Sequence, residues 1–275
     1  MLACLLMRLL GRRAVLSALL TILCFAGTPI AHAQDMMKDL DLSSPEMTEA
    51  EMSREQVIEA LNAASADQPA DFTGRMLNGL DLSGLDFSGA ILRAVRLNDA
   101  NLEGADLEGA ILDQAWMLNV NLAGANLRNA NLFQAQLIGG RLDGADFSEA
   151  RVASDLSRAS IKGANFTGAS LGADMKNQSM GLMRGVLKKA DLEGADFTGA
   201  DLSRVDFEFA SLKGADLTDA NLMRASLGGA DLTGANIEGA NFNEADVSSA
   251  KLKGLTGADS SNLDKAMNLK SAFRD

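Results

Sequence analysis

The stretch that decides the fold is NLEGADLEGA, residues 101–110, in which the five-residue word NLEGA is followed at once by DLEGA. An amphipathic helix repeats about every 3.6 residues and a strand about every 2, so neither explains a period of five. A large apolar residue recurs at every fifth position from Phe72 to Val152, from Leu156 to Leu171 and, after an irregular stretch, from Leu182 to Leu252. This period predicts a chain that turns a corner once in each word.

The residues of each word have distinct expected roles. The apolar centre and the residue two before it, usually Ala, are expected to point inward, while the other three face water. Four corners close a square coil, and successive coils stack with the spacing of paired strands, about 4.8 Å. Gly is common at the second position after the centre because a type II turn needs φ > 0 there. Where that corner holds Gln134, Glu149 or Arg204, we expect a different turn type.

Several stretches of the chain resemble one repeat family. ANLEGADLEGA (100–110), GADFTGADLS (194–203) and GGADLTGANIEGANF (228–242) look like the pentapeptide-repeat family, whose motif is A-(D/N)-L-x-x. The resemblance covers about residues 70–254. It implies an all-β solenoid, a right-handed quadrilateral parallel β-helix, which agrees with the coil predicted from the period of five. We expect short capping helices at both ends, because an uncovered solenoid edge invites aggregation.

The first 33 residues have the pattern of a secretory signal peptide. A basic segment precedes an apolar run at residues 14–25, and the small-residue sequence AHA follows at residues 31–33. We expect cleavage after Ala33, with export to the periplasm or the medium. The apolar run is too short to span a bilayer comfortably, so no stable membrane span is expected after cleavage. The general secretory route is favoured, although GRRAVLS at residues 11–17 also resembles a twin-arginine signal.

The mature chain would have few groups that can carry out chemistry. Residues 1–33 contain both cysteines, the single histidine and three of the 25 basic residues, so 22 basic and 37 acidic residues would remain, a net charge of −15. Without Cys and His, the common nucleophile pairs and Cys/His zinc sites are excluded. The stacked aspartates lack a calcium loop, and we find no Walker or dinucleotide motif. We therefore predict no catalytic residue, no metal site, no cofactor and no enzymatic activity.

The segments on either side of the repeats are expected to cover the two edges of the solenoid. Residues 34–69 consist of an acidic leader and a helix that begins with the capping box Ser53 to Gln56. Residues 255–275 are expected to form a C-terminal capping helix with Ser261 as its N-cap. Its expected apolar side consists of Leu263, Ala266, Met267 and Phe273. In some similar proteins such a helix joins two copies, which makes a homodimer a further hypothesis.

The repeat is irregular between residues 153 and 186. The stretch GADMKNQSMGLMRGV (172–186) lacks the repeat word and contains Met175, Met180 and Met183. One interpretation is a bulge that the solenoid tolerates. The other is a projecting loop that binds a protein partner, since loops on rigid scaffolds commonly carry binding function.

Apolar residues also occupy positions that should point outward. Stacking the coils brings together six of them on two adjoining sides: Ile91, Ile111, Trp116, Leu118, Phe133 and Ile138. A contiguous outward apolar patch is typical of a protein-binding surface. The alternatives are incidental exposure and cover by the N-terminal leader folding back.

Two functions are compatible with these features. The first is a non-catalytic exported scaffold or adaptor that binds an unidentified protein through a rigid acidic rod, without direct nucleic-acid binding. The second follows from the resemblance: some pentapeptide-repeat proteins mimic DNA, bind DNA gyrase and protect it from toxins or drugs. The net charge fits the second function, but the signal peptide favours the first, because gyrase is cytosolic.

Overall fold

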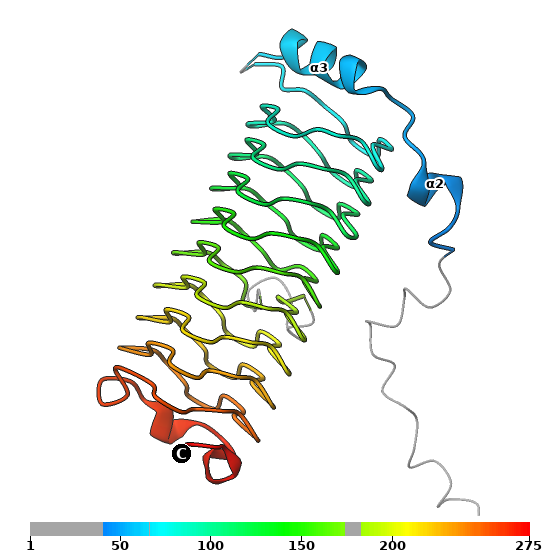
Figure 1. Cartoon of the computed structure of the whole chain (residues 1–275). Coiled ribbons are helices and arrows are strands. Elements are labelled where there is room, and N and C mark those ends of the chain that lie inside the picture. The colour runs from blue at the N-terminus through cyan, green and yellow to red at the C-terminus, as the bar shows by residue number, and fades with distance from the viewer. Residues whose placement is uncertain (1–40, 66, 174–182) are drawn as a thin grey trace, which may run out of the picture. The chain divides into compact units, whose positions relative to one another are not determined.

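The computed structural model describes residues 41–65, 67–173 and 183–275. The chain divides into two units, Met1–Asp41 and Leu42–Asp275. Of the first unit only Asp41 is described. The second unit is a stack of four-sided coils, with helical segments before the first coil and after the last one (Figure 1). In the described part of the chain, no helix is both long enough and apolar enough to cross a membrane.

The helical segments of the second unit are short. Two α-helices precede the coils, α2 (Pro45–Thr48) and α3 (Arg54–Ala63). Two 3₁₀ helices follow them, η2 (Leu263–Lys265) and η3 (Leu269–Ser271). Most other regular structure in the described part of the chain consists of single-residue parallel bridges between coils, because each side of a coil is too short to form a longer strand. Two antiparallel bridges, Ala50 with Leu77 and Ser65 with Gln68, lie at the N-terminal end.

Four ladders of bridges define the four sides of the coil. We number the sides by their first bridge: side 1, Asp71 with Ile91; side 2, Met76 with Arg96; side 3, Asp81 with Asn101; side 4, Asp86 with Asp106. Each of these four bridges joins residues one turn of 20 positions apart, as the period of five predicted. The quadrilateral parallel β-helix is therefore present.

The hydrogen bonds of one word explain its composition. In ANLEG (100–104), the N–H of Asn101 donates to the preceding coil at 2.9 Å, and those of Leu102 and Gly104 donate to the following coil at 2.7 and 2.9 Å. The ladders leave the N–H of Glu103 unpaired, and it donates to the side-chain oxygen of Asn101 at 3.3 Å. Asp or Asn at the start of a side thus satisfies the one backbone donor that stacking cannot, which is why the word contains it.

The interior consists of the predicted apolar centres. Leu102, Leu122 and Leu142 are almost completely buried and belong to three successive coils of side 3. On side 4 the rings of Phe147, Phe166 and Phe197 stack, with centroids 4.8 and 4.9 Å apart. This spacing matches the distance between paired strands, so the ring stack and the backbone ladders reinforce each other.

The described corners of regular five-residue words keep one backbone conformation. Glycine corners such as Gly104 have positive φ, as a type II turn requires. The expectation of a different turn at non-glycine corners is wrong, since Gln134, Glu149 and Arg204 have φ of 61°, 59° and 63°. The ladders on both sides of a corner determine its geometry, so the residue there must adopt the left-handed conformation whatever its side chain.

The irregular region combines a shortened coil with a lengthened one. Gln136 bridges Asp155, one residue short of a full turn, and Asp155 then bridges Val186, 11 residues beyond one. Between them, residues 156–171 keep the regular ladder, so the irregularity is narrower than 153–186. The N–H of Gly185 closes the corner on the carbonyl of Leu171 at 2.7 Å, and the repeat resumes at Leu187. The predicted centre at Leu182 lies outside the described residues.

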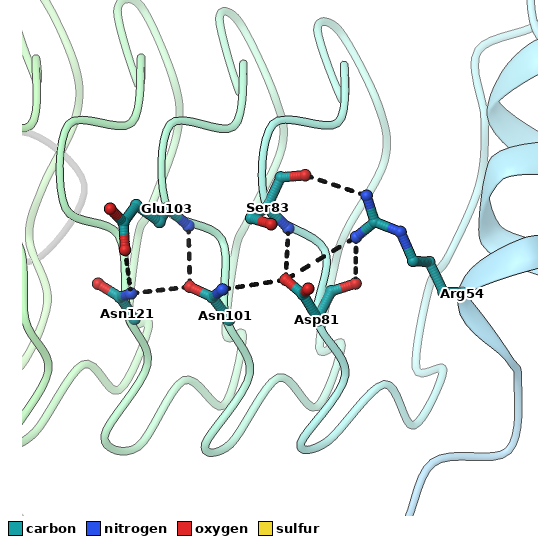
Figure 2. Close-up of polar contacts among 6 residues, drawn as sticks. All are labelled: Arg54, Asp81, Ser83, Asn101, Glu103 and Asn121. Carbon is teal, nitrogen blue, oxygen red and sulfur yellow. Dashed lines mark hydrogen bonds and ion pairs between the residues drawn. The ribbon is translucent and has the colours of Figure 1, made fainter.

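The N-terminal edge is covered by α3 and the residues before it. The predicted capping box is present: the Ser53 hydroxyl accepts from the N–H of Gln56, whose side chain accepts from the N–H of Ser53. Val57 is completely buried against the first coils. Figure 2 shows the Arg54 guanidinium donating to the carbonyls of Asp81 and Ser83, backbone acceptors of the first coil.

The C-terminal edge does not carry the predicted capping helix. The chain instead continues as an irregular coil that contains η2 and η3, in which Met267 bridges Asp246 and Phe273 bridges Lys251. The carbonyls of this path accept hydrogen bonds from N–H groups of the last regular coil. In an α-helix the same carbonyls would have been used within the helix. The predicted apolar side is consequently split: Leu263 is buried, but Met267 and Phe273 are 49% and 60% exposed.

Candidate protein-binding surface

The six predicted apolar residues lie on sides 1 and 2 of neighbouring coils. We call them the apolar edge: Ile91, Ile111 and Phe133 on side 1, and Trp116, Leu118 and Ile138 on side 2. Ile91 and Ile111 are directly bridged, as stacking predicted. All six are half-buried rather than fully exposed, because neighbouring coils and side chains cover part of each.

Phe133 shows how this partial cover arises. The guanidinium carbon of Arg151, one coil further, lies 4.0 Å from the centroid of the Phe133 ring. A cation over an aromatic face stabilises both groups and screens that face from water. Phe133 therefore offers only the remainder of its surface to a partner.

The end of the irregular loop reaches the apolar edge. The amide of Gln134 donates to the sulfur of Met183 at 2.8 Å, and accepts from the amide of Gln114 at 3.2 Å. Gln134 directly follows Phe133, so Met183 lies beside the apolar edge. Met175 and Met180, predicted to bind with it, lie outside the described residues.

The described part of the leader covers side 2 of the first two coils. The buried amides of Asn78 and Asn98 donate to the carbonyls of Glu49 and Met47 at 2.9 and 3.1 Å. Met47 is itself buried. The Asn98 oxygen in turn accepts from the N–H of Leu118 at 2.9 Å. The leader is therefore fixed next to the apolar edge, on the coils that precede Trp116.

A charged cluster lies on side 2 beyond the loop. Asp206 is almost buried and pairs with Lys188 at 3.1 Å and with Arg184 at 3.8 Å. Burial disfavours the charged Lys188, but hydrogen bonds to Glu208 and Asp206 outweigh it and raise the pKa of the Lys188 ammonium. The cluster attaches the loop's last residues to the coil, because Arg184 directly follows Met183.

Sequence reasoning missed the most exposed large apolar residue of the described chain. Phe209 is 63% exposed at the corner after side 2, with φ of 59°. Two exposed basic residues, Arg158 and Lys189, occupy the same corner in the two preceding coils. The available signal was an aromatic residue at the glycine position of the word.

The part of the chain that the structure describes contains no candidate metal site. In these described residues there is no group of three or more acidic or histidine side chains placed to hold a metal ion. Two open hollows lie at the N-terminal end, one beside Glu51 and Arg75 and the other between α3 and Pro69. What the surface can offer is shape, apolar contact and fixed charge, which are the means of protein recognition.

A family model covers most of the coils. The model named Pentapeptide repeats matches with eight copies, over residues 70–104, 91–132, 119–149, 186–219 and 220–254. The third match ends at residue 149 and the fourth begins at residue 186, and the gap between them contains the shortened coil and the loop. No match was found among curated proteins.

Solved structures of similar proteins include three informative cases. HetL, a pentapeptide repeat protein involved in heterocyst differentiation regulation in Nostoc sp. strain PCC 7120, is 30% identical, with 81% of this chain and 97% of that chain covered and a TM-score of 0.42. A pentapeptide repeat protein of the Arabidopsis thaliana thylakoid lumen is 31% identical. The match covers 46% of this chain and 68% of that chain, with a TM-score of 0.25. QnrB1, a plasmid-mediated fluoroquinolone resistance protein, is 20% identical. The match covers 74% of this chain and 85% of that chain, with a TM-score of 0.36. None of these matches indicates a catalytic family.

Proposed function

The chain belongs to the pentapeptide-repeat family, and from that premise we propose that it is an exported, non-catalytic scaffold that binds another protein through its apolar edge. The observation that carries the proposal is the distribution of outward residues. Between residues 81 and 254, the outward positions of sides 3 and 4 are polar or glycine except for Ala123. The large apolar departures lie on sides 1 and 2, where nothing in the coil requires them.

The physical case for binding rests on what remains exposed. Half-buried aromatic and aliphatic side chains on a rigid ladder lose little conformational entropy when a partner covers them. Trp116 and Phe133 are of the type that dominates interface energies. Export is supported by the signal-peptide pattern of residues 1–33, which also separates this chain from cytosolic partners.

The proposal is tested by capturing the partner from the native cell envelope. Trp116→Asp should abolish co-purification of the partner while leaving folding intact, because it places a charge within the apolar edge. Ser211→Asp is the matched control, since it adds the same charge at the same position of the word on side 3. Equal capture by both variants and the wild type would exclude the apolar edge.

The DNA-mimic alternative is separated by a gyrase supercoiling assay with the mature chain. We expect no effect at micromolar protein, and protection or inhibition would favour the alternative. Fractionation with N-terminal sequencing tests export, which requires a mature chain that begins after Ala33.

A homodimer through the C-terminal end is also part of the proposal. Exposed Met267 and Phe273 support it, in place of the helix that was expected there. Light scattering of wild type and Phe273→Lys tests it, and a monomer for the wild type would remove it.

A further inference from the structure

A row of three unusual side chains runs along the corner after side 2. Arg158, Lys189 and Phe209 belong to successive coils: the N–H of Arg158 donates to the carbonyl of Lys188 at 2.9 Å, and the N–H of Lys189 donates to that of Glu208 at 3.0 Å. Successive coils lie about 4.8 Å apart. The row therefore spans about 10 Å along the coil axis.

The backbone of this row is strained. The three residues have φ of 61°, 58° and 59°, a conformation that residues other than glycine adopt only at a cost. Glycine would avoid that cost, and every corner after side 3 from Gly84 to Gly254 is glycine. The fold alone would favour glycine in the row as well, as it would at other non-glycine corners such as Asn129 and Glu149, so what distinguishes the row is the chemistry of its three side chains.

The row is open to solvent. Phe209 is 63% exposed, and its ring rests over Gly229, with Cδ1 only 2.7 Å from where a Cβ of that residue would lie. Arg158 and Lys189 are exposed and, among the described residues, neither is in an ion pair. Their neighbours Arg184 and Lys188 are instead paired, Arg184 with Asp206 and Lys188 with both Asp206 and Glu208. Two free cations beside an aromatic ring thus stand on a chain that is strongly acidic overall.

We propose that Arg158, Lys189 and Phe209 form a docking site for a short acidic segment of a partner protein that also carries a large apolar side chain. Carboxylates of the segment would pair with the two cations, and its apolar residue would pack on the exposed face of Phe209. Charge complementarity favours this occupant, because two exposed cations outside any ion pair among the described residues attract carboxylates on a chain that is acidic overall. Three extended residues span the row, at about 3.3 Å each.

This inference rests on the proposed function, since it names the chemistry of a partner segment, but it uses a different part of the molecule from the apolar edge. The test is a random peptide library displayed on phage and selected on the mature protein. Counter-selection uses a variant with Arg158→Gly, Lys189→Gly and Phe209→Gly. Because glycine is the favoured corner residue, this variant should fold at least as well as the wild type.

A matched control is available at the corner after side 4. Asn129→Gly, Glu149→Gly and Asp219→Gly also replace three residues of positive φ by glycine. We expect selected peptides to be acidic with one large apolar residue, to bind the control variant like the wild type, and to bind the row variant at least tenfold more weakly. Neutral or basic peptides, no selection, or equal binding to both variants would overturn the inference.

The two proposals fail in distinguishable ways. Loss of peptide binding in the row variant, with unchanged partner capture by Trp116→Asp, would remove the apolar edge and keep the row. The reverse result would remove the row alone. Binding of an anionic vesicle or a single-stranded oligonucleotide at the row, without binding of acidic peptides, would also overturn the inference.

Discussion

Side 3 and side 2 of the same coil follow different rules. On side 3, Asp81, Asn101 and Asn121 form a ladder in which each Asn amide donates to the side-chain oxygen of the preceding coil, at 2.9 and 2.7 Å (Figure 2). Its corners are all glycine. Side 2 places Trp116, Leu118 and charged residues at the equivalent outward positions, and its corner includes Phe209.

The difference shows which residues the fold requires. Both sides bury the same kind of apolar centre and form the same ladders, so the interior does not distinguish them. On side 3 the outward residues satisfy backbone donors and avoid strain. On side 2 fewer outward residues satisfy backbone donors, and several corners are strained. Each non-glycine residue in the left-handed region costs roughly 1–2 kcal/mol of folding free energy. A side that departs from the fold's preferences in this way is the side where binding is to be sought.

The largest expected effect on the free energy of unfolding comes from truncating an interior leucine, and an outward leucine serves as the comparison. Leu122 is completely buried on side 3, and Leu118 is half-buried on the outside of side 2. Leu122→Ala should lower the free energy of unfolding by about 2–5 kcal/mol, because it leaves a cavity in a narrow bore. Leu118→Ala should lower it by less than about 1 kcal/mol.

Urea unfolding followed by far-ultraviolet circular dichroism measures both values. Equal losses for Leu118→Ala and Leu122→Ala would mean that Leu118 stabilises the coil as an interior residue does. The apolar edge would then be structural, and the contrast between the two sides would disappear.

The second effect concerns two neighbouring corners. Phe209 and Gly214 occupy successive corners, after side 2 and side 3, with φ of 59° and 60°. Gly214→Phe should destabilise the protein by about 1–2 kcal/mol, although a Cβ there meets no neighbouring atom, because the left-handed backbone disfavours an L-residue. Phe209→Gly should stabilise it by about 1 kcal/mol for the same reason.

Thermal unfolding of the two variants measures this pair of effects. A loss of stability in Phe209→Gly would show that the ring packs on Gly229 strongly enough to offset the strain. Phe209 would then be a structural residue of the coil, and the docking row would lose its main argument.

The coil could be predicted because one word encodes it many times. Each word contains its own inward pair and most words contain Asp or Asn before the apolar centre, so departures in single words do not matter. The C-terminal end could not be predicted in this way, since spacing alone cannot show that the N–H groups of Val247 and Leu252 take the carbonyls of Met267 and Phe273. The conformation of corners such as Arg204 was also missed, because the stacked coils impose it and the local residue does not.

A third prediction compares a carboxylate on each side. Asp206 on side 2 is nearly buried between Lys188 and Arg184, whereas Asp231 on side 3 pairs with the more exposed Lys251 and Lys213. Asp206→Asn should cost about 1 kcal/mol and release the end of the loop, since charged hydrogen bonds are worth more when shielded from water. Hydrogen exchange at residues 183–186 should rise in this variant and stay unchanged in Asp231→Asn.

The smallest effect is the dependence of stability on pH through Asp231. Burial disfavours its charged form, but hydrogen bonds from Thr233 and Lys251 outweigh this and hold the pKa of the Asp231 carboxyl below its ordinary value of 3.8. A carboxyl with a lowered pKa stabilises the folded state above the unfolded pKa, and this contribution is lost as pH falls through the folded value. The difference in urea midpoint between wild type and Asp231→Asn should therefore be constant from about pH 8 to pH 5 and shrink below about pH 4. A difference that persists at low pH would show that Asp231 acts through packing, and that side 3, like side 2, carries residues chosen for more than the hydrogen bonds of the coil.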